Sequence, residues 1–282
     1  MYFTKKISLL FLASLFMSSA TWCQTSMISY NIKYDNKSDT INNWNFRKEK
    51  LVQLVEYYEP SVVGMQEVLF NQLNYINDHL KNYNYVGVGR DDGKTKGEFS
   101  PIFYDSRKYK VLKSSTFWLS EKPDEISVGW DASLERICTY GLFEDLQTSE
   151  KIWIFNTHFD HRGKKARVFS AKLVLERIKE INTANYPLVF MGDLNVMPHE
   201  HAIQLLKEAL DEGLEISKKP LYGPPGTSNG FRDGPILRKI DYIFTKHMDV
   251  LSYRHIDERL DSNKHISDHL PVMVELKPKN GK

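Results

Sequence analysis

The sequence has little cysteine: Cys23 and Cys138 are the two among its 282 residues. Cys23 lies at the end of an expected leader, so Cys138 would be the single thiol of the mature chain. An intramolecular disulfide is then excluded, even in an oxidising compartment. We therefore expect the stability of the fold to come from an apolar core.

The sequence also lacks an apolar run long enough to span a bilayer. The run at 7–16 is too short, and it has the flanks of a secretory signal peptide: Lys5 and Lys6 before it, and small residues at 18–20 after it. We expect cleavage between about Ala20 and Gln24. The mature protein would then be secreted or periplasmic, without a stable membrane anchor. The alternative is a short anchor that is retained uncleaved.

Neither sign of charge is in excess once this leader is removed. Loss of Lys5 and Lys6 lowers Lys plus Arg from 38 to 36, which equals the 36 Asp plus Glu. Proteins that hold long nucleic acids through their phosphates usually carry a basic excess, so the composition argues against that task. We find no Pro/Gly/Ser-rich linker, repeat or low-complexity run. Residues 1–23 are thus expected to be a signal peptide, and residues 24–282 a single, monomeric domain.

Apolar periodicity predicts many strands and a few helices. Strand-like runs occur at 27–33, 61–65, 83–89, 100–104, 109–119, 137–144, 151–158, 188–191, 240–244, 250–255 and 271–276. Helical spacing occurs at 47–58, 71–80, 165–181 and 200–212. Helices separate some strands and hairpins separate others. This pattern predicts an α/β fold in which two β-sheets pack face to face, with helices outside.

Polar residues recur where the predicted strands end, and this predicts a site. The dipeptides and short runs are Tyr30–Asn31, Gln66–Glu67, Asn156–Thr157–His158, Asp193–Leu194–Asn195, Ile240–Asp241–Tyr242 and Asp268–His269. Any one of them alone is typical of a turn or helix cap, but six at one topological position favour a shared site. In an extended segment, Asp193 and Asn195 would face the same way.

Glu67 follows a nearly continuous apolar strand, where an unpaired carboxylate would be costly to desolvate. A hard divalent cation would satisfy it. Oxygen ligands without cysteine favour Mg²⁺ or Mn²⁺ over Zn²⁺. Acids, amides and two histidines around such a metal are what the transfer of a phosphoryl group to water requires.

Six motifs in order resemble those of the endonuclease/exonuclease/phosphatase (DNase I-like) superfamily: SYNI at 29–32, GMQEV at 64–68, NTHFDH at 156–161, MGDLN at 191–195, KIDYIF at 239–244 and SDHLPV at 267–272. The resemblance covers residues 27 to about 277. It implies a four-layer α/β sandwich, with two packed mixed β-sheets flanked by helices, in agreement with the layers expected from periodicity.

The resemblance also implies roles for individual residues. Glu67 matches the metal-binding Glu, Asn31 the Asn that helps to hold the metal and phosphate region, and Asp268 the acid beside the metal. The expected cofactor is Mg²⁺, for which Mn²⁺ can substitute.

Five further positions match the catalytic residues of the family. His158 matches a residue that contacts the scissile phosphate, Asp193 the residue that orients or deprotonates the attacking water, and Asn195 its neighbour at the same centre. His269 matches the His that stabilises the phosphoryl oxygens, and Asp241 the Asp that holds its imidazole. Physical reasoning supports the last pair, because an imidazole kept protonated beside a phosphate needs an acidic partner.

Substrate contacts are expected from the loops. The candidates are Arg90 on the charged loop 87–104, Trp130, and Asn229 and Phe231 on a Gly-rich loop. Each has a structural alternative: Arg90 as part of a solvated charged loop, and the aromatic residues packed under loops. For Asp160, His161 and Arg162, contact with substrate and a role in starting the following helix are equally expected.

The sequence therefore predicts a metal-dependent phosphoesterase that acts on a small or exposed phosphodiester or phosphomonoester by in-line attack of an activated water. The alternatives are a nuclease acting on DNA or RNA, and then a sphingomyelinase- or phosphoinositide-type lipid phosphoesterase. A catalytically silent binding module would be expected to have lost Glu67, Asp193 or His269, and all three are present.

Overall fold

The computed structural model describes residues 24–279, so the expected leader at 1–23 lies outside the described residues. The helices are α1 (Trp44–Tyr58), α2 (Phe70–His79), α3 (Lys164–Ile181) and α4 (His201–Lys207). The strands are β1 (Thr25–Asn31), β2 (Val62–Gln66), β3 (Tyr83–Val86), β4 (Ile102–Asp105), β5 (Tyr109–Trp118), β6 (Ile137–Asp145), β7 (Lys151–His158), β8 (Leu188–Asp193), β9 (Asp211–Glu212), β10 (Asp241–Lys246), β11 (Met248–His255) and β12 (Val272–Pro278).

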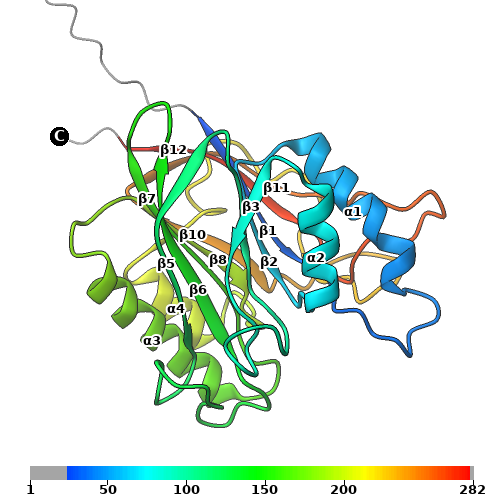
Figure 1. Ribbon diagram of the computed structural model, residues 1–282, viewed down its shortest axis with the longest axis horizontal. Coiled ribbons are helices and arrows are strands. Elements are labelled where there is room, and N and C mark those ends of the chain that lie inside the picture. Colours follow the sequence, from blue (N-terminus) through cyan, green and yellow to red (C-terminus); the bar gives the residue numbers. More distant parts are fainter. Residues whose placement is uncertain (1–23, 280–282) are drawn as a thin grey trace, which may run out of the picture.

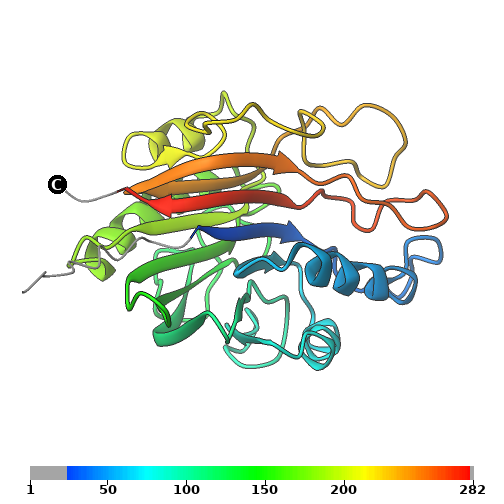
Figure 2. The same ribbon diagram turned by 90° about the horizontal axis from the view of Figure 1, so that it is seen from above.

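These strands form two six-stranded mixed sheets. The first has the order β11-β12-β1-β2-β4-β3 and the second β5-β6-β7-β8-β10-β9. Within them, β1 pairs with β2 and β7 with β8 in parallel, and the other pairs are antiparallel. Figure 2 shows β11, β12 and β1 side by side. The predicted pair of mixed sheets is confirmed.

The two sheets pack against each other, and the helices cover their outer faces (Figure 1). Strand β1 shows why its sequence is almost continuously apolar: Met27 lies in the core between the sheets, and Ile28 in the core under α1 and α2. A third core lies between the second sheet and α3 and α4. Both faces of the central strands of each sheet are therefore buried, and the predicted four-layer sandwich is confirmed. None of the helices in residues 24–279 is long and apolar enough to cross a membrane.

Strand register brings the polar strand ends to one edge of the sandwich. Asn31 is level with Gln66 in the parallel pair β1/β2, and His158 is level with Asp193 in β7/β8. Asp241 is also opposite Asp193, because β10 runs antiparallel to β8. Asp241 thus begins its strand and does not end it, contrary to the expectation from sequence. Residues 268–269 precede β12, the antiparallel neighbour of β1, in agreement with the strand predicted at 271–276.

The predicted helix at 200–212 is shorter than expected. Helix α4 ends at Lys207, and Asp211–Glu212 form the edge strand β9, which pairs with Thr245 and Phe244 of β10. Glu212 also forms a buried ion pair with Lys239, with 3.0 Å between Oε1 and Nζ. Tertiary pairing therefore overrides the helical pattern at these residues. The predicted strand at 83–89 likewise ends at Val86.

His255 ties the long loop before β10 to the end of β11. Its side chain is 1% exposed, and its Nδ1 donates a hydrogen bond to the carbonyl oxygen of Pro224 at 2.7 Å. Burial lowers the pKa of His255 to about 4. In the unfolded chain this imidazole would titrate near its ordinary value.

A pH-dependent loss of stability follows from His255. Between about pH 6.5 and pH 4 the unfolded chain binds a proton that the folded chain excludes, so stability falls as pH falls through this window, by about 1 kcal/mol per pH unit. We expect His255→Gln, whose amide can still donate to Pro224, to lack this contribution. Urea unfolding of both proteins at pH 7.5, 6 and 5 measures it. A difference in unfolding free energy that does not change with pH would contradict the assignment.

Candidate active site

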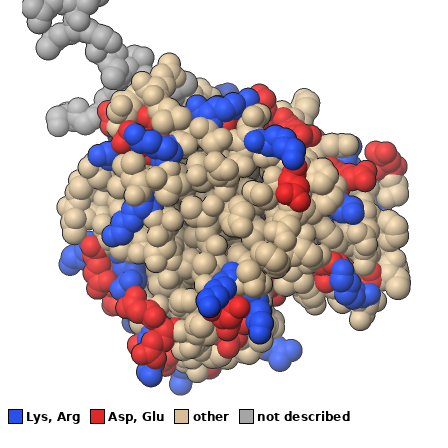
Figure 3. Space-filling view, viewed as in Figure 1, with Lys and Arg blue, Asp and Glu red and all other residues tan. Residues whose placement is uncertain are grey.

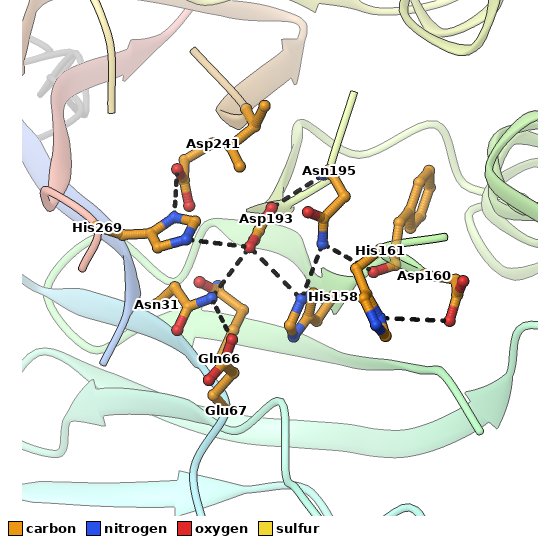
Figure 4. Close-up of polar contacts among 12 residues, drawn as sticks. Asn31, Gln66, Glu67, His158, Asp160, His161, Asp193, Asn195, Asp241 and His269 are labelled. Carbon is orange, nitrogen blue, oxygen red and sulfur yellow. Dashed lines mark hydrogen bonds and ion pairs between the residues drawn. The ribbon is translucent and has the colours of Figure 1, made fainter. Parts of the chain in front are cut away.

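Asp193, at the end of β8, lies at the centre of the polar edge (Figure 4). Its Oδ2 accepts a hydrogen bond from Nδ2 of Asn31 at 3.0 Å. The same oxygen is 3.4 Å from Nε2 of His158 and 3.7 Å from Nε2 of His269. Four segments that are distant in sequence therefore meet at one carboxylate oxygen.

His269 is held by a carboxylate, as the sequence predicted. Its Nδ1 is 2.8 Å from Oδ2 of Asp241, and that oxygen also accepts a 2.6 Å hydrogen bond from the Thr227 hydroxyl. Burial alone would lower the pKa of His269, but the carboxylates of Asp241 and Asp193 outweigh it and hold the pKa well above its ordinary value. His269 is thus an imidazolium, and its Nε2–H faces Asp193.

The pKa of Asp193 is higher than that of an ordinary surface carboxylate. Its burial, and after it the negative charge of Asp241, raise its pKa to about 7, although His269 acts against this rise. A carboxylate with a pKa near neutrality is suited to take a proton from water at physiological pH. The structure therefore places a base and a cationic donor side by side.

Asn195 reaches the site through a turn. The chain leaves the strand after Asp193, Asn195 has a left-handed backbone (φ +51°), and its N–H donates to Oδ1 of Asp193 at 2.9 Å. The extended geometry expected for residues 193–195 is therefore wrong. An Asx turn, which asparagine and aspartate favour, replaces it and still directs the Asn195 amide toward the site.

The Asn195 amide fixes His158. Its Nδ2 lies 3.1 Å from Nε2 of His158, so the amide donates and the imidazole accepts. Burial, followed by the positive charges of Arg136 and Arg90, holds the pKa of His158 well below its ordinary value. His158 is thus neutral with its proton on Nδ1, which is 3.9 Å from a carboxylate oxygen of Glu98.

Glu67 and Asp268 form a second carboxylate group beside the first. Oε1 of Glu67 accepts from the Asn31 amide at 3.1 Å, and Oε2 accepts from the backbone N–H of Tyr34 at 3.2 Å. The ammonium of Lys33 lies 3.5 Å from Glu67 and 3.3 Å from Asp268. Burial would raise the pKa of Glu67, but Lys33 and Asn31 outweigh it and the pKa is lowered. Glu67 is therefore an anion.

Two groups of side chains can hold a metal ion. Asp193, Asp241 and His269 are buried and offer ligand atoms that lie within 4.8 Å of one another. The imidazole of this trio already uses Nδ1 to bind Asp241, and an imidazolium is not a ligand. Glu67 and Asp268 offer only oxygen, lie beside one ammonium, and match the ligand preference of Mg²⁺ better.

Two predicted substrate residues are engaged with the protein. Arg90 is 8% exposed and forks onto Glu98, with Nη1 at 2.8 Å and Nη2 at 3.3 Å from its two oxygens. Trp130 stacks on Phe169 of α3, with ring centroids 5.3 Å apart. Arg90 is thus paired inside its loop, and Trp130 packs on a side chain of α3.

Asn229 and Phe231 lie on a loop that is hydrogen-bonded to the segment carrying Asp268 and His269. Nδ2 of Asn229 donates to the carbonyl oxygen of Ser267 at 3.0 Å, and its Oδ1 accepts from the N–H of Phe231 at 2.7 Å. The Phe231 ring lies over the guanidinium of Arg47, with 5.6 Å between them. In this structure Asn229 contacts the segment that carries Asp268, whereas Phe231 contacts Asn229 and Arg47.

Arg47 of α1 is a buried arginine that binds backbone carbonyl groups of two separate segments. Its side chain is 1% exposed, and Nη1 donates to the carbonyl oxygens of Ile32 at 2.7 Å and Ile266 at 2.9 Å. Its Nη2 donates to the carbonyl oxygen of Lys33 at 3.1 Å. One guanidinium thereby joins the segment after Asn31 to the segment before Asp268.

Glu98 lies close to His158 and Thr227 binds Asp241, and the sequence did not predict either contact. Burial raises the pKa of Glu98, and the negative charge of Glu67 adds to this effect. Thr227 lies in the Gly-rich loop 226–231, from which the sequence predicted only Asn229 and Phe231 as site residues.

Asp160 is buried, and it accepts hydrogen bonds from the backbone N–H groups of Ser133, Arg162 and Gly163.

The remaining candidates lie beside Asp160. Nη2 of Arg136 is 2.9 Å from Nδ1 of His161, whose side chain is 43% exposed. The exposed N–H groups at the start of α3 are bound by Asp131, since the N–H groups of Lys165 and Ala166 donate to its carboxylate. Asp131, and not Asp160, therefore caps the helix.

Comparison with known proteins extends this description. A solved structure of an endonuclease/exonuclease/phosphatase family protein from Bacteroides thetaiotaomicron is 37% identical, with a TM-score of 0.86, and covers 91% of this chain and 98% of its own. A mannosyl-6-phosphatase from Bacteroides thetaiotaomicron VPI-5482 is 38% identical, with a TM-score of 0.85 and coverage of 90% and 99%. A probable RNA exonuclease from Saccharomyces cerevisiae is 27% identical over 84% of this chain, which spans 46% of that protein.

The sequence profile of the Endonuclease/Exonuclease/phosphatase family matches residues 28–269, which include every residue of the site described above. On the evidence of this match, of the two-sheet sandwich and of the solved structures above 30% identity, the chain belongs to the Endonuclease/Exonuclease/phosphatase family.

Proposed function

We propose that this protein is a secreted, Mg²⁺-dependent phosphoesterase that hydrolyses a small phosphate ester by in-line attack of water. The observation that carries the proposal is the buried arrangement of Asp193, whose Oδ2 is 3.7 Å from Nε2 of His269, with Asp241 holding the other nitrogen of that imidazole at 2.8 Å. Export is proposed from the signal-like residues 1–23.

Each residue has a role that its surroundings support. Asp193 accepts a proton from the attacking water as the new P–O bond forms and the ester P–O bond breaks, and the leaving alkoxide takes a proton from solvent water. Nε2–H of His269 donates to a phosphoryl oxygen, and Asp241 keeps that imidazole charged and oriented. The side-chain amide of Asn31 and the backbone N–H of Asn195 orient the base, since each donates to a different oxygen of Asp193. Fixed donors of this kind stabilise the charge that develops in the transition state.

Glu67 and Asp268 would hold the cation. Their oxygen ligands fit a hard divalent ion, and Asn31 keeps Glu67 in place through the hydrogen bond to Oε1. When bound, Mg²⁺ would neutralise charge on the phosphate oxygens. Mn²⁺, which accepts similar ligands, is proposed as a substitute.

A small substrate is favoured by the distribution of charge. Lys and Arg are interspersed with Asp and Glu on the face in Figure 3, and no continuous basic surface is visible there. Arg90 is already neutralised by Glu98. The similarity to a mannosyl-6-phosphatase makes a sugar 6-phosphate the first candidate. The nuclease alternative is kept because one relative is named a probable RNA exonuclease, and a lipid phosphoester ranks third.

Metal dependence is the first expected outcome. EDTA should abolish hydrolysis of any substrate found, and Mg²⁺ or Mn²⁺ should restore it, because Glu67 and Asp268 would otherwise repel the phosphate. Initial rates before and after chelation and repletion measure this. Full activity in the presence of the chelator would overturn the mechanism.

Substitutions at the base and the imidazolium should affect rate more than folding. We expect His269→Ala and Asp193→Asn each to lower kcat on the order of 10²-fold or more, because each removes a group that acts in the transition state. His79→Ala, at the exposed end of α2, is the control and should keep the wild-type rate. The measurements are kcat and the thermal unfolding midpoint. A large loss of thermal stability with only a few-fold loss of rate would identify the pair as structural.

Substrate size can be tested at matched phosphate concentration. We expect mannose 6-phosphate, other sugar phosphates or nucleotides to be hydrolysed faster than plasmid DNA, RNA or a lipid phosphodiester at about 0.15 M salt, where weak phosphate contacts are screened. Released phosphate and gel electrophoresis report the two classes. Rapid degradation of plasmid or RNA under these conditions would favour the nuclease alternative.

A further inference from the structure

Lys33 lies between the two carboxylates that are proposed to hold the metal. Its Nζ is 3.5 Å from Oε2 of Glu67 and 3.3 Å from Oδ2 of Asp268. The side chains are 27%, 12% and 16% exposed, in the order Lys33, Glu67 and Asp268. One ammonium thus balances two anions that come from opposite ends of the chain and are largely withdrawn from water.

The backbone of Lys33 is fixed by its neighbours. Its N–H donates to Oδ1 of Asn31 at 3.1 Å, and its carbonyl oxygen accepts from Arg47 at 3.1 Å and from Gln72 at 3.0 Å. Its φ is +59°, a left-handed conformation that is unfavourable for a residue with a Cβ. The surroundings therefore impose this position, which distinguishes Lys33 from a surface lysine that has found an acid by chance.

The ammonium and a divalent cation require the same oxygens. Mg²⁺ binds carboxylate oxygens at about 2.1 Å, so an ion shared by Glu67 and Asp268 would approach the atoms that Nζ now contacts. Two cations so close repel each other strongly in a partly buried site. Binding of the metal must therefore weaken or displace the contacts of Lys33.

We propose that Lys33 is a built-in counter-ion of the metal site, which stabilises the Glu67–Asp268 pair in the metal-free protein and competes with the divalent cation for it. This inference rests on the proposed metal-dependent function. Lys33 is a positioning residue in this role, and it sets the affinity of the site for the cation without entering the reaction. A lysine that only contacted the substrate phosphate would instead change KM and leave metal affinity unaltered.

Lys33→Met tests the proposal, with Lys37→Met as the matched control. Lys37 lies on the same loop and pairs with Asp35, which does not contact the site carboxylates. Each protein is stripped of metal, and calorimetric titration with Mg²⁺ and with Mn²⁺ gives Kd. Thermal unfolding is measured with and without each metal.

We expect Lys33→Met to bind Mg²⁺ about tenfold more tightly than the wild type, since a competing charge is removed. Its metal-free unfolding midpoint should fall, and its gain on adding metal should be larger. Lys37→Met should match the wild type in Kd. Lys33→Gln should behave as Lys33→Met does, and it replaces that variant if the latter does not fold.

Two results would overturn the inference, and they differ in what else they affect. If the wild type binds Mg²⁺ and the Lys33 variants bind it with equal or lower affinity, the counter-ion role fails and the proposed function stands. If the wild type shows neither heat of binding nor a shift in unfolding with Mg²⁺ or Mn²⁺, the metal assignment fails, and the inference fails with it.

Discussion

Two buried carboxylates, Asp193 and Asp241, lie beside the imidazole of His269, and this crowding of charge governs the rest of the site. Asp193 is 1% exposed, Asp241 is 0% exposed and His269 is 8% exposed. A buried charge without a partner is strongly destabilising, and one imidazolium cannot fully compensate two carboxylates. Oδ2 of Asp241 accepts hydrogen bonds from both Nδ1 of His269 and the hydroxyl of Thr227. The remaining carboxylate, Asp193, therefore keeps a high affinity for a proton.

The surrounding backbone holds these charges together. The register of β8 with β10 sets the backbone of Asp241 opposite that of Asp193, and hydrogen bonds from other segments then hold the two carboxylates. His269 comes from a segment outside the strands, and that segment depends on other supports. The N–H of Asn229 donates to the carbonyl oxygen of Asp268 at 2.8 Å, and Arg47 binds the carbonyl oxygen just before Ser267. Loss of either support would move His269 without removing any group that touches substrate.

The sequence predicted the parts of the site that depend on local pattern. An apolar strand that is buried over nearly its whole length places its last residue at the sheet edge, so the positions of Asn31 and His158 followed from the apolar runs. Features that depend on distant segments could not be predicted in this way. Arg47 resembles any arginine near the start of a helix, and its burial requires carbonyl groups 15 and 219 residues away. Likewise, nothing local shows that Asn195 adopts a left-handed backbone or that Arg90 forks onto Glu98.

Asn31 explains how two neighbouring carboxylates acquire opposite properties. Its single NH₂ group donates one hydrogen to Glu67 and the other to Asp193, at 3.1 Å and 3.0 Å. A carboxylate at this position would add a third anion, and an ammonium would favour ionisation of both acids. The neutral amide joins the two acids and leaves their charges to their other neighbours. Lys33 then keeps Glu67 anionic, and burial beside Asp241 keeps Asp193 basic. The surroundings, and not the type of residue, therefore make Glu67 the anionic partner of a cation and Asp193 a proton acceptor.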